Sequence, residues 1–406
     1  MNVVIIGNSA AGLNALAEFR KYDKDSQVTI ISHEEGPAYS RVLLPYYLRK
    51  KVSWDHLFIR KDEDYEKYNA KTLWKTTVVD VDAENHLVVL DNGEKLFFDK
   101  LLIASGSSPV KPPIENLNGP GVYHLWTLDD IRHLDPLFKE GNKLLVLGSG
   151  FIALQGGWAA LQRGLSVSVY ELMTQIMPRI LDEKAAEIFQ NKIHSHGVDL
   201  QTGVSTTKVE RDGHGKLTVY AKDKEPLEID AIIVGTGVRA NTGFLNNTKI
   251  EMNRGILVNS KMETNVPGIY AAGDVAVAPD TFGNPHISHA LWPTAVEHGQ
   301  VAGANLAGQN KEYTGSLNMN VTQMYGVTVA SMGIFQPAED EEGISIVCPK
   351  MEKENQYCKL VFKNDIPIGG IALGESEGAG LLGMVRPFIR LKKPLTGATA
   401  LRVNNL

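Results

Sequence analysis

Hydrophobic residues occur along the chain in short blocks, and the spacing of each block predicts its secondary structure. An apolar run at residues 3–6 precedes a glycine-containing turn, a helical pattern at 13–22 and a second apolar run at 28–31. The same succession returns at 144–170, with a run at 144–147 and a helix to about residue 163. Short apolar runs that alternate with helices are typical of parallel strands. The pattern therefore predicts an α/β protein with two Rossmann-like nucleotide-binding domains.

Other parts of the chain have different patterns. Residues 78–98 alternate between apolar and polar and contain the turn sequence Asp91-Asn92-Gly93, which predicts antiparallel strands. From about residue 313, short strand-like runs at 325–332 and 357–362 predict a separate α+β module.

The composition narrows the class of protein. A chain of 406 residues has room for two to three domains of about 150 residues each. It carries 41 basic and 47 acidic residues, and this net charge of −6 argues against a nucleic-acid partner, which needs a basic surface. Only two cysteines occur, Cys348 and Cys358, so neither a disulfide framework nor a cysteine-rich metal centre is expected.

Two segments bear on targeting. The start of the chain has neither the basic region nor the cleavage site of a signal peptide. Residues 144–162 carry no charge and are long enough to span a bilayer, but glycines interrupt them. A strand, a turn and a helix of a globular domain explain this stretch better. We expect a soluble, cytoplasmic protein with no membrane span and no metal site.

The second glycine turn has the spacing of a dinucleotide-binding fingerprint. Gly148 permits the tight turn, Gly150 lets the backbone approach a pyrophosphate, and Ala153 lets the helix pack closely on the strand. Free N–H groups at the start of the helix attract the phosphates. Glu171 ends the next strand, where a carboxylate can bind a ribose 2′-hydroxyl. The predicted ligand of this domain is NAD rather than NADP.

The first glycine turn departs from this pattern. Gly7 and Gly12 occupy the outer positions, but Ser9 stands in the middle. Serine is small, and Ala10 and Ala11 keep the turn compact, so a pyrophosphate can still approach. From these residues alone, a nucleotide site and a purely structural turn both remain open.

A third element decides between these alternatives. Residues 264–275 read TNVPGIYAAGDV, and apolar runs end in ASG at 104–106 and GTG at 235–237. Together with the two turns, these segments resemble the FAD- and NAD(P)-dependent reductases of the pyridine nucleotide-disulfide oxidoreductase superfamily. The resemblance implies a glutathione-reductase-like fold without the redox disulfide. In this fold an FAD domain, expected at 1–112 and 239–311, is split around an NAD domain at 113–238, and a C-terminal interface module follows at 312–406. It also implies that Asp274 binds the ribityl chain of FAD and Glu34 the adenosine ribose.

Two further segments indicate a narrower branch. Residues 38–45, AYSRVLLP, and 291–299, LWPTAVEHG, resemble the NADH:rubredoxin reductases and the flavin-binding part of NAD(P)H nitrite reductases. The resemblance places Arg41, Pro45 and Trp292 near the flavin. The residues expected to contact FAD are Gly7, Ser9, Ala10, Ala11, Gly12, Glu34, Arg41, Ala104, Ser105, Gly106, Gly273, Asp274 and Trp292, and those expected to contact NAD are Gly148, Gly150, Phe151, Ile152, Gln155, Glu171 and Gly237.

Some positions differ from those of related enzymes. The early CxxxxC pair is absent, and relatives that use a single cysteine place it where this chain has Val42. We therefore expect no thiol to relay electrons at the flavin, and we interpret Cys348 and Cys358 as buried structural thiols. Many relatives have glutamate where this chain has Gln155, which can hydrogen-bond to the nicotinamide carboxamide without bringing a charge.

The resemblance implies that hydride passes from NADH to FAD and that electrons then pass to an acceptor. The acceptor is expected to be a redox carrier such as rubredoxin or ferredoxin, or a partner metalloenzyme subunit. Two alternatives remain open: an NADH oxidase or peroxidase, and a non-catalytic flavoprotein that responds to NADH. A homo-oligomer also remains open.

The end of the chain is basic. Residues 378–406 contain no aspartate or glutamate. One interpretation is a helix that packs on the C-terminal module and leaves its basic end in water. The other is a docking face for an acidic electron carrier. The positive charges of this tail are Arg386, Arg390, Lys392, Lys393 and Arg402.

Overall fold

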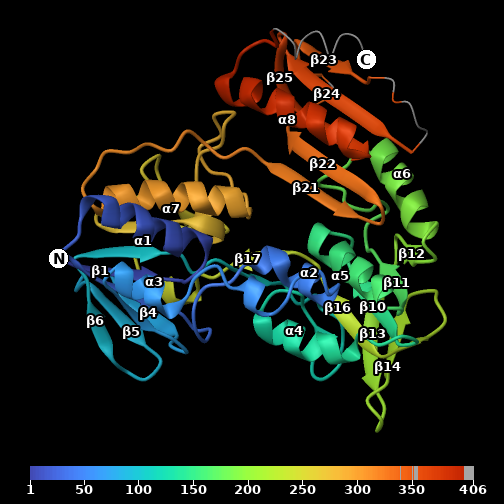
Figure 1. Cartoon of the computed structure of the whole chain (residues 1–406), viewed down its shortest axis with the longest axis horizontal. Helices are drawn as coiled ribbons and strands as arrows, with labels where there is room; N and C mark the ends of the chain where they lie inside the picture. Colours follow the sequence, from blue (N-terminus) through green and yellow to red (C-terminus); the bar gives the residue numbers. More distant parts are fainter. Residues whose placement is uncertain (339, 350, 352–354, 397–406) are drawn as a thin grey trace. The chain divides into compact units, whose positions relative to one another are not determined.

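The computed structural model describes residues 1–338, 340–349, 351 and 355–396. The chain divides into two compact units, and each unit is assembled from segments that are distant in sequence (Figure 1). The first unit comprises Met1–Arg41, Trp54–Ser108 and Val238–Leu317. The second comprises Val42–Ser53, Pro109–Gly237 and the chain from Asn318 onward. The four domains expected from the sequence are a finer division than these two units, and their boundaries stay a prediction.

A five-stranded parallel sheet forms the core of the first unit. Its strand order is β19-β7-β1-β2-β3, and the inner positions of these apolar runs are buried. The predicted strands at 3–6 and 28–31 are confirmed as β1 and β2. The bounds are β1 (Asn2–Ile6), β2 (Gln27–Ile31), β3 (Ala70–Leu73), β7 (Lys100–Ile103) and β19 (Ile269–Ala271).

Helices α1 (Ala10–Tyr22) and α7 (Trp292–Leu306) lie side by side on this sheet (Figure 1). Their backbones touch, because a Cβ atom added to Gly303 would lie 2.3 Å from the carbonyl oxygen of Ala15. The predicted antiparallel strands at 78–98 are confirmed. The other elements of this unit are α3 (Asp62–Lys67), β4 (Val78–Asp82), β5 (Leu87–Leu90), β6 (Lys95–Phe97), β18 (Ile256–Leu257) and β20 (Ala276–Val277). Strand β8 (Ser107–Pro109) lies where the chain leaves this unit, and it pairs with β17 (Val238–Ala240), where the chain returns to it.

A second five-stranded parallel sheet, of order β12-β11-β10-β16-β9, forms the core of the second unit. The uncharged stretch at 144–162 is a strand, a turn and a helix, as predicted, and no helix among the described residues is long and apolar enough to cross a membrane. The bounds are α2 (Leu44–Leu48), β9 (Val122–Tyr123), α4 (Leu128–Leu134), β10 (Lys143–Leu147), α5 (Phe151–Gln162), β11 (Ser166–Tyr170), α6 (Glu183–His194), β12 (Asp199–Gln201), β13 (Thr206–Arg211), β14 (Leu217–Ala221), β15 (Leu227–Ile229) and β16 (Ala231–Val234).

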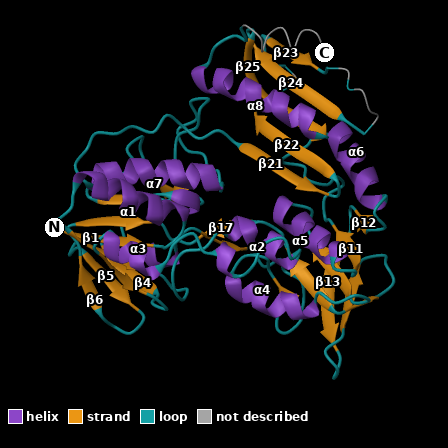
Figure 2. Ribbon diagram, in the orientation of Figure 1, coloured by secondary structure: helices purple, strands orange, loops and turns teal. Residues whose placement is uncertain are grey.

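The C-terminal module is an antiparallel sheet of order β21-β22-β25-β24-β23, with α8 along it (Figure 2). The predicted strand at 325–332 begins later, at Val327, because Tyr325 (φ 50°) and Gly326 (φ 77°) form the hairpin turn. Positive φ at both central residues is the geometry of a type I′ turn. The bounds are β21 (Met319–Met324), β22 (Val327–Gly333), β23 (Ile344–Val347), β24 (Tyr357–Lys363), β25 (Ile366–Gly374) and α8 (Ser376–Leu391).

Candidate functional site: two dinucleotide turns

The predicted FAD residues of the first unit lie at one edge of its sheet. Strands β19, β7, β1 and β2 are adjacent and parallel, so their carboxyl ends meet at the same edge. Ligands of open parallel sheets bind at such an edge. The turn from Gly7 to Gly12 follows β1, Glu34 follows β2, the segment 104–106 follows β7, and Asp274 follows β19.

The first glycine turn is tightly built. Gly7 has φ +117°, and a Cβ atom there would lie 2.0 Å from the carbonyl oxygen of Ala104. Ser9 caps α1 without a side-chain hydrogen bond, and the first turn of the helix contains no acidic residue. The first N–H groups of α1 have no partner within the helix, and no negative side chain stands among them, so they can bind a phosphate.

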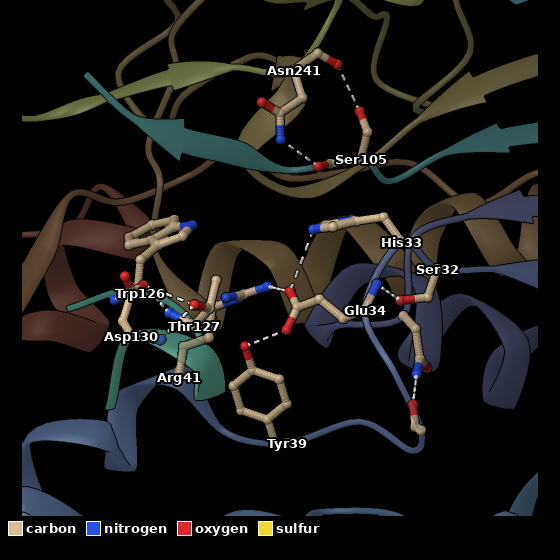
Figure 3. A network of polar contacts seen from close by, with 12 residues as sticks. Ser32, His33, Glu34, Tyr39, Arg41, Ser105, Trp126, Thr127, Asp130 and Asn241 are labelled. Atoms are coloured by element: carbon tan, nitrogen blue, oxygen red, sulfur yellow. Dashed lines mark hydrogen bonds and ion pairs between the residues drawn. The ribbon is translucent and has the colours of Figure 1, made fainter. Parts of the chain in front are cut away.

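Glu34 lies beyond the end of β2 in a polar network (Figure 3). The hydroxyl of Tyr39 donates to Glu34 Oε2 at 2.6 Å, and the guanidinium of Arg41 pairs with Oε1. The sequence singled out Glu34 and Arg41 separately and missed both their pairing and the role of Tyr39. This carboxylate is half-buried and held by two side chains that a ribose hydroxyl could replace.

Asp274 lies in the short helical turn after β19. Its Oδ2 accepts a hydrogen bond from Ser107 Oγ at 2.7 Å. Burial raises the pKa of Asp274, while this hydrogen bond and the nearby charge of Arg41 oppose the shift. A half-buried carboxylate that accepts from one hydroxyl retains acceptor capacity for a polyol chain. The residues present therefore fit FAD, and Ser107 is a residue that the sequence analysis missed.

The segments that join the first unit to the rest of the chain are hydrogen-bonded to each other. Ser105 Oγ donates to the carbonyl of Asn241 at 2.8 Å, and the Asn241 amide donates to the carbonyl of Ser105 at 2.9 Å (Figure 3). This reciprocal pair fixes the segment 104–106 beside the glycine turn. In the second unit, Thr127 caps α4, and Asp130 Oδ2 accepts from the hydroxyl and the N–H of Thr127 (Figure 3).

Helix α7 begins at Trp292, and its first turn contains no acidic residue. Six residues further along the helix, His298 is buried, and its Nδ1 accepts the N–H of Gly273 at 3.4 Å. Burial lowers the pKa of His298 to about 4, so the imidazole is neutral at physiological pH. His289 is bonded to Ser316 Oγ at 2.7 Å. Among the described residues, no cluster of histidine, cysteine and carboxylate groups could hold a metal.

The NAD residues of the second unit also share a sheet edge, after β10, β11 and β16. Gly148 has φ +97°, and Gly150 caps α5, whose first turn holds Phe151 and Ile152 and contains no acidic residue. Gly237 follows β16 with φ +100° and open space around its Cα atom. The strand, turn and helix that the fingerprint requires are all present.

Glu171 is buried and already hydrogen-bonded. Its Oε2 accepts from the N–H of Ser149 at 2.8 Å and from the Ser149 hydroxyl at 2.6 Å. Its Oε1 accepts the N–H of Met173 at 2.8 Å. The carboxylate therefore braces the glycine turn as well as standing where the ribose is expected. Ser149 is a second residue that the sequence analysis missed.

Several predicted residues have other surroundings than expected. Gln155 donates from Nε2 to Thr322 Oγ1 of strand β21. Pro45 lies in α2 of the second unit, close in sequence to Val42, and its expected place near the flavin stays a prediction. Cys358 is buried, and burial raises its pKa to about 12. The interpretation of Cys348 as a buried thiol is wrong, because Cys348 is exposed directly after the edge strand β23.

Each of the two parallel sheets carries a dinucleotide-binding turn, so the fold is that of a protein that binds two dinucleotides. The chain belongs to the pyridine nucleotide-disulphide oxidoreductase family, whose model matches residues 1–299. It is an oxidoreductase that uses FAD and NADH. The predicted resemblance and fold class are confirmed.

Individual relatives match nearly the whole chain. The NADH oxidase of Methanocaldococcus jannaschii is 32% identical over 93% of this chain and 88% of its own length. The epsilon subunit of the NADH-dependent phenylglyoxylate dehydrogenase of Aromatoleum evansii is 29% identical over 91% and 87%. The NADH-rubredoxin oxidoreductase of Clostridium acetobutylicum is 28% identical over 90% and 92%. The structure of an NAD-dependent persulfide reductase from A. fulgidus has a TM-score of 0.89, at 25% identity over 97% of this chain and 77% of that one.

Proposed function

We propose that this protein oxidises NADH and delivers the electrons, through FAD, to a redox carrier such as rubredoxin or ferredoxin or to a partner redox subunit. The main support is that both dinucleotide turns are intact on one chain while Val42 stands where relatives with a redox thiol have cysteine. The similarity to the rubredoxin oxidoreductase of Clostridium and to the dehydrogenase subunit of Aromatoleum supports an acceptor outside the chain.

FAD is assigned to the sheet edge of the first unit. The N–H groups at the start of α1 would bind its pyrophosphate. Asp274 would accept from the ribityl hydroxyls, and Glu34 would bind the adenosine ribose in place of Tyr39 or Arg41. Bound flavin supplies the chemistry of accepting a hydride and releasing electrons one at a time. The polypeptide contributes orientation, through a turn whose backbone is fixed by Gly7 and by the pair of Ser105 and Asn241.

NADH is assigned to the corresponding edge of the second unit. The N–H groups at the start of α5 would bind its pyrophosphate, and Glu171 would accept from the adenosine ribose while it braces Ser149. Gln155 would bind the nicotinamide carboxamide. No protein group needs to take up a proton in hydride transfer, so these residues bind and orient only.

The first experiment is the anaerobic addition of NADH to the purified flavoprotein, followed by addition of an acceptor. NADH should bleach the flavin absorbance, and rubredoxin or ferredoxin should restore it. The variant with Cys348→Ser and Cys358→Ser should do both at the wild-type rate, because no thiol takes part. A folded variant whose flavin still bleaches but no longer reoxidises with the carrier would show that a cysteine participates.

The similarity to the NADH oxidase of Methanocaldococcus favours a second candidate, direct reduction of oxygen. Oxygen consumption in air, measured beside carrier reduction on the same preparation, separates the two. Turnover by oxygen that equals or exceeds turnover by every carrier would favour the oxidase. Bleaching that no acceptor reverses would instead favour an NADH-responsive flavoprotein without turnover.

The partner and the compartment are proposals of the same kind. Residues 312–406 are assigned as the interface module, either for a homo-oligomer or for a partner subunit. The two free cysteines support a reducing, cytoplasmic location. Light scattering on the purified protein and identification of proteins that co-purify from native extract test whether this module joins copies of the chain or a partner subunit.

A further inference from the structure

The hairpin of β21 and β22 contacts helix α5 of the NAD-binding sheet at two points within the second unit. Gln155 Nε2 donates a hydrogen bond to Thr322 Oγ1, between residues 167 positions apart. Two residues further along α5, Gly157 faces the tip of the hairpin, and a Cβ atom there would lie 3.0 Å from the Tyr325 hydroxyl. Both contacts fall within one turn of α5, so the hairpin packs against the part of α5 that includes Gln155.

The tip of the hairpin is fixed by an aromatic cluster. Tyr325 is completely buried, and its ring centroid lies 4.9 Å from that of Trp158, 6.0 Å from that of His196 and 6.2 Å from that of Phe189. These partners come from α5, from the segment after α6 and from α6 itself. Because the type I′ turn leaves two residues between the strands, fixing Tyr325 also fixes the position of Thr322 on β21.

A buried polar group holds the same module at a third point. Asp182 caps α6, and its Oδ2 accepts from the Tyr357 hydroxyl at 2.9 Å and from Lys359 Nζ at 3.0 Å. Both donors come from β24, at the other side of the sheet from β21. With an ion pair, a hydroxyl and an aromatic cluster between them, the sheet and the NAD-binding helices form one packed body.

The consequence is that the amide of Gln155 is oriented before NADH arrives. Its N–H group is engaged by Thr322, while its Oε1 has no partner in the part of the chain that the structure describes. A carbonyl oxygen is an acceptor, and the carboxamide of nicotinamide carries two N–H donors. A glutamine side chain has several freely rotating bonds, so holding it in advance removes the entropic penalty of ordering it on binding.

We propose that Thr322 is a positioning residue for hydride transfer, which fixes the Gln155 amide so that its oxygen is presented to the nicotinamide carboxamide. The inference rests on the proposed function, in particular on the assignment of Gln155. It gives the C-terminal module a role in the NADH site of its own chain, separate from any role in assembly.

The test compares Thr322→Val, which keeps the shape and removes the hydroxyl, with Thr322→Ser, which keeps the hydroxyl. Thr322→Val should lower the rate constant of flavin bleaching at saturating NADH about threefold to tenfold, the effect of losing one neutral hydrogen bond. NAD⁺ should also bind more weakly by calorimetry, a measurement that needs no turnover. Thr322→Ser should restore both values. The matched control is Tyr325→Phe, which keeps the ring and should leave both values unchanged.

Gln155→Ala completes a double-mutant cycle. If Thr322 acts through Gln155, Thr322→Val should have no further effect in the Gln155→Ala background. An equal effect in both backgrounds, or no effect of Thr322→Val in the wild type, would overturn the proposal. If Gln155→Ala itself bleaches at the wild-type rate, the assignment of Gln155 fails and the proposal with it. In that case the continued bleaching by NADH leaves the proposed function standing, whereas a wild-type flavin that NADH does not bleach would overturn the function itself.

Discussion

Two polar side chains of the first unit, the half-buried Asp274 and the buried His298, lie beside the sheet edge that is proposed to hold FAD. Asp274 accepts a hydrogen bond from the Ser107 hydroxyl, and His298 uses one nitrogen to accept the Gly273 N–H. Groups of this kind are unfavourable in the protein alone, because burial removes their hydration. Their contribution therefore depends on what binds them and on their protonation.

Asp274→Ala should weaken FAD binding. A hydrogen bond to a buried carboxylate contributes about 1.5–3 kcal/mol, so the dissociation constant of FAD should rise at least about tenfold. Fluorescence titration of the apoprotein with FAD measures it. Ser107→Ala serves as the comparison, because it removes the protein partner of Asp274 and leaves its carboxylate. An unchanged dissociation constant in Asp274→Ala would show that the carboxylate does not bind the flavin.

His298 should make the protein less stable in mild acid. Its pKa in the folded state is lowered from 6.5 to about 4, so between these values the unfolded chain binds a proton that the folded chain does not. Stability is therefore lost as the pH falls through this window, by up to about 3 kcal/mol. His298→Gln keeps an acceptor for Gly273 and cannot titrate. Urea unfolding at pH 7 and pH 5 should show a smaller loss in the variant, and equal losses would contradict the assignment.

At the scale of elements, each candidate nucleotide site consists of a strand, a turn and a helix. A carboxylate fixes the turn of the second unit, and a close contact between helices fixes the first unit. Glu171 braces the second turn through Ser149, and the small residues of α1 and α7 let two helices touch at the first. Both devices tolerate little change, because the helix contact leaves no free space and the carboxylate is hydrogen-bonded through both of its oxygens.

NADH should be preferred to NADPH. The 2′-phosphate of NADPH would meet the buried carboxylate of Glu171, and the exposed residues that follow it, Leu172 and Met173, bring no positive charge. Loss of the ribose hydrogen bond together with repulsion should disfavour NADPH by about 2–3 kcal/mol, roughly a hundredfold. Stopped-flow bleaching of the flavin with each nucleotide measures this, and equal rates and affinities would show that Glu171 is misassigned.

Gly303→Ala should destabilise the first unit. The added methyl group would lie 2.3 Å from the carbonyl oxygen of Ala15, so the helices must separate. Overpacking of this kind is unfavourable by about 1–3 kcal/mol. The control is Gly380→Ala in α8, where the new methyl group meets open space and should leave stability unchanged or raise it. Denaturant midpoints of the two variants that do not differ would contradict the close packing.

The sequence predicted the elements whose contacts are local. The turns after β1 and β10 were predictable because a strand, a glycine turn and a helix are adjacent along the chain. The contacts of Gln155 with Thr322 and of Asp182 with Tyr357 were not, because they join residues 167 and 175 positions apart and no periodicity encodes them. Cys348 was misjudged because cysteines are buried on average, whereas this one follows an edge strand.

At the scale of the whole molecule, a mildly acidic chain ends in a basic segment. The predicted helix is confirmed as α8, which ends at Leu391, and Lys392 and Lys393 are exposed directly after it. Arg402 lies outside the described residues. The exposure of these lysines is consistent with a docking face for an acidic carrier, which stays a prediction.

Reversal of the exposed pair, Lys392→Glu with Lys393→Glu, should slow reduction of an acidic carrier at low ionic strength. Steering by charge is screened by salt, so the difference from wild type should vanish as the Debye length falls. Hydride transfer from NADH to the flavin should not change. Carrier reduction that responds neither to salt nor to the reversal would return the segment to a structural role.

Segments of the two units alternate along the chain, so the two sheets are completed at different times during synthesis. The sheet of the first unit is completed when β19 pairs with β7, and Ile269 lies beside Leu101 in that pairing. At ribosomal speeds of about 5–20 residues per second, β19 emerges roughly 10–30 s after β7. The parallel sheet of the second unit needs nothing beyond β16 and is complete in the meantime. A nascent chain therefore presents the open edge of β7 for that interval, and we expect the first unit to depend on chaperones more than the second.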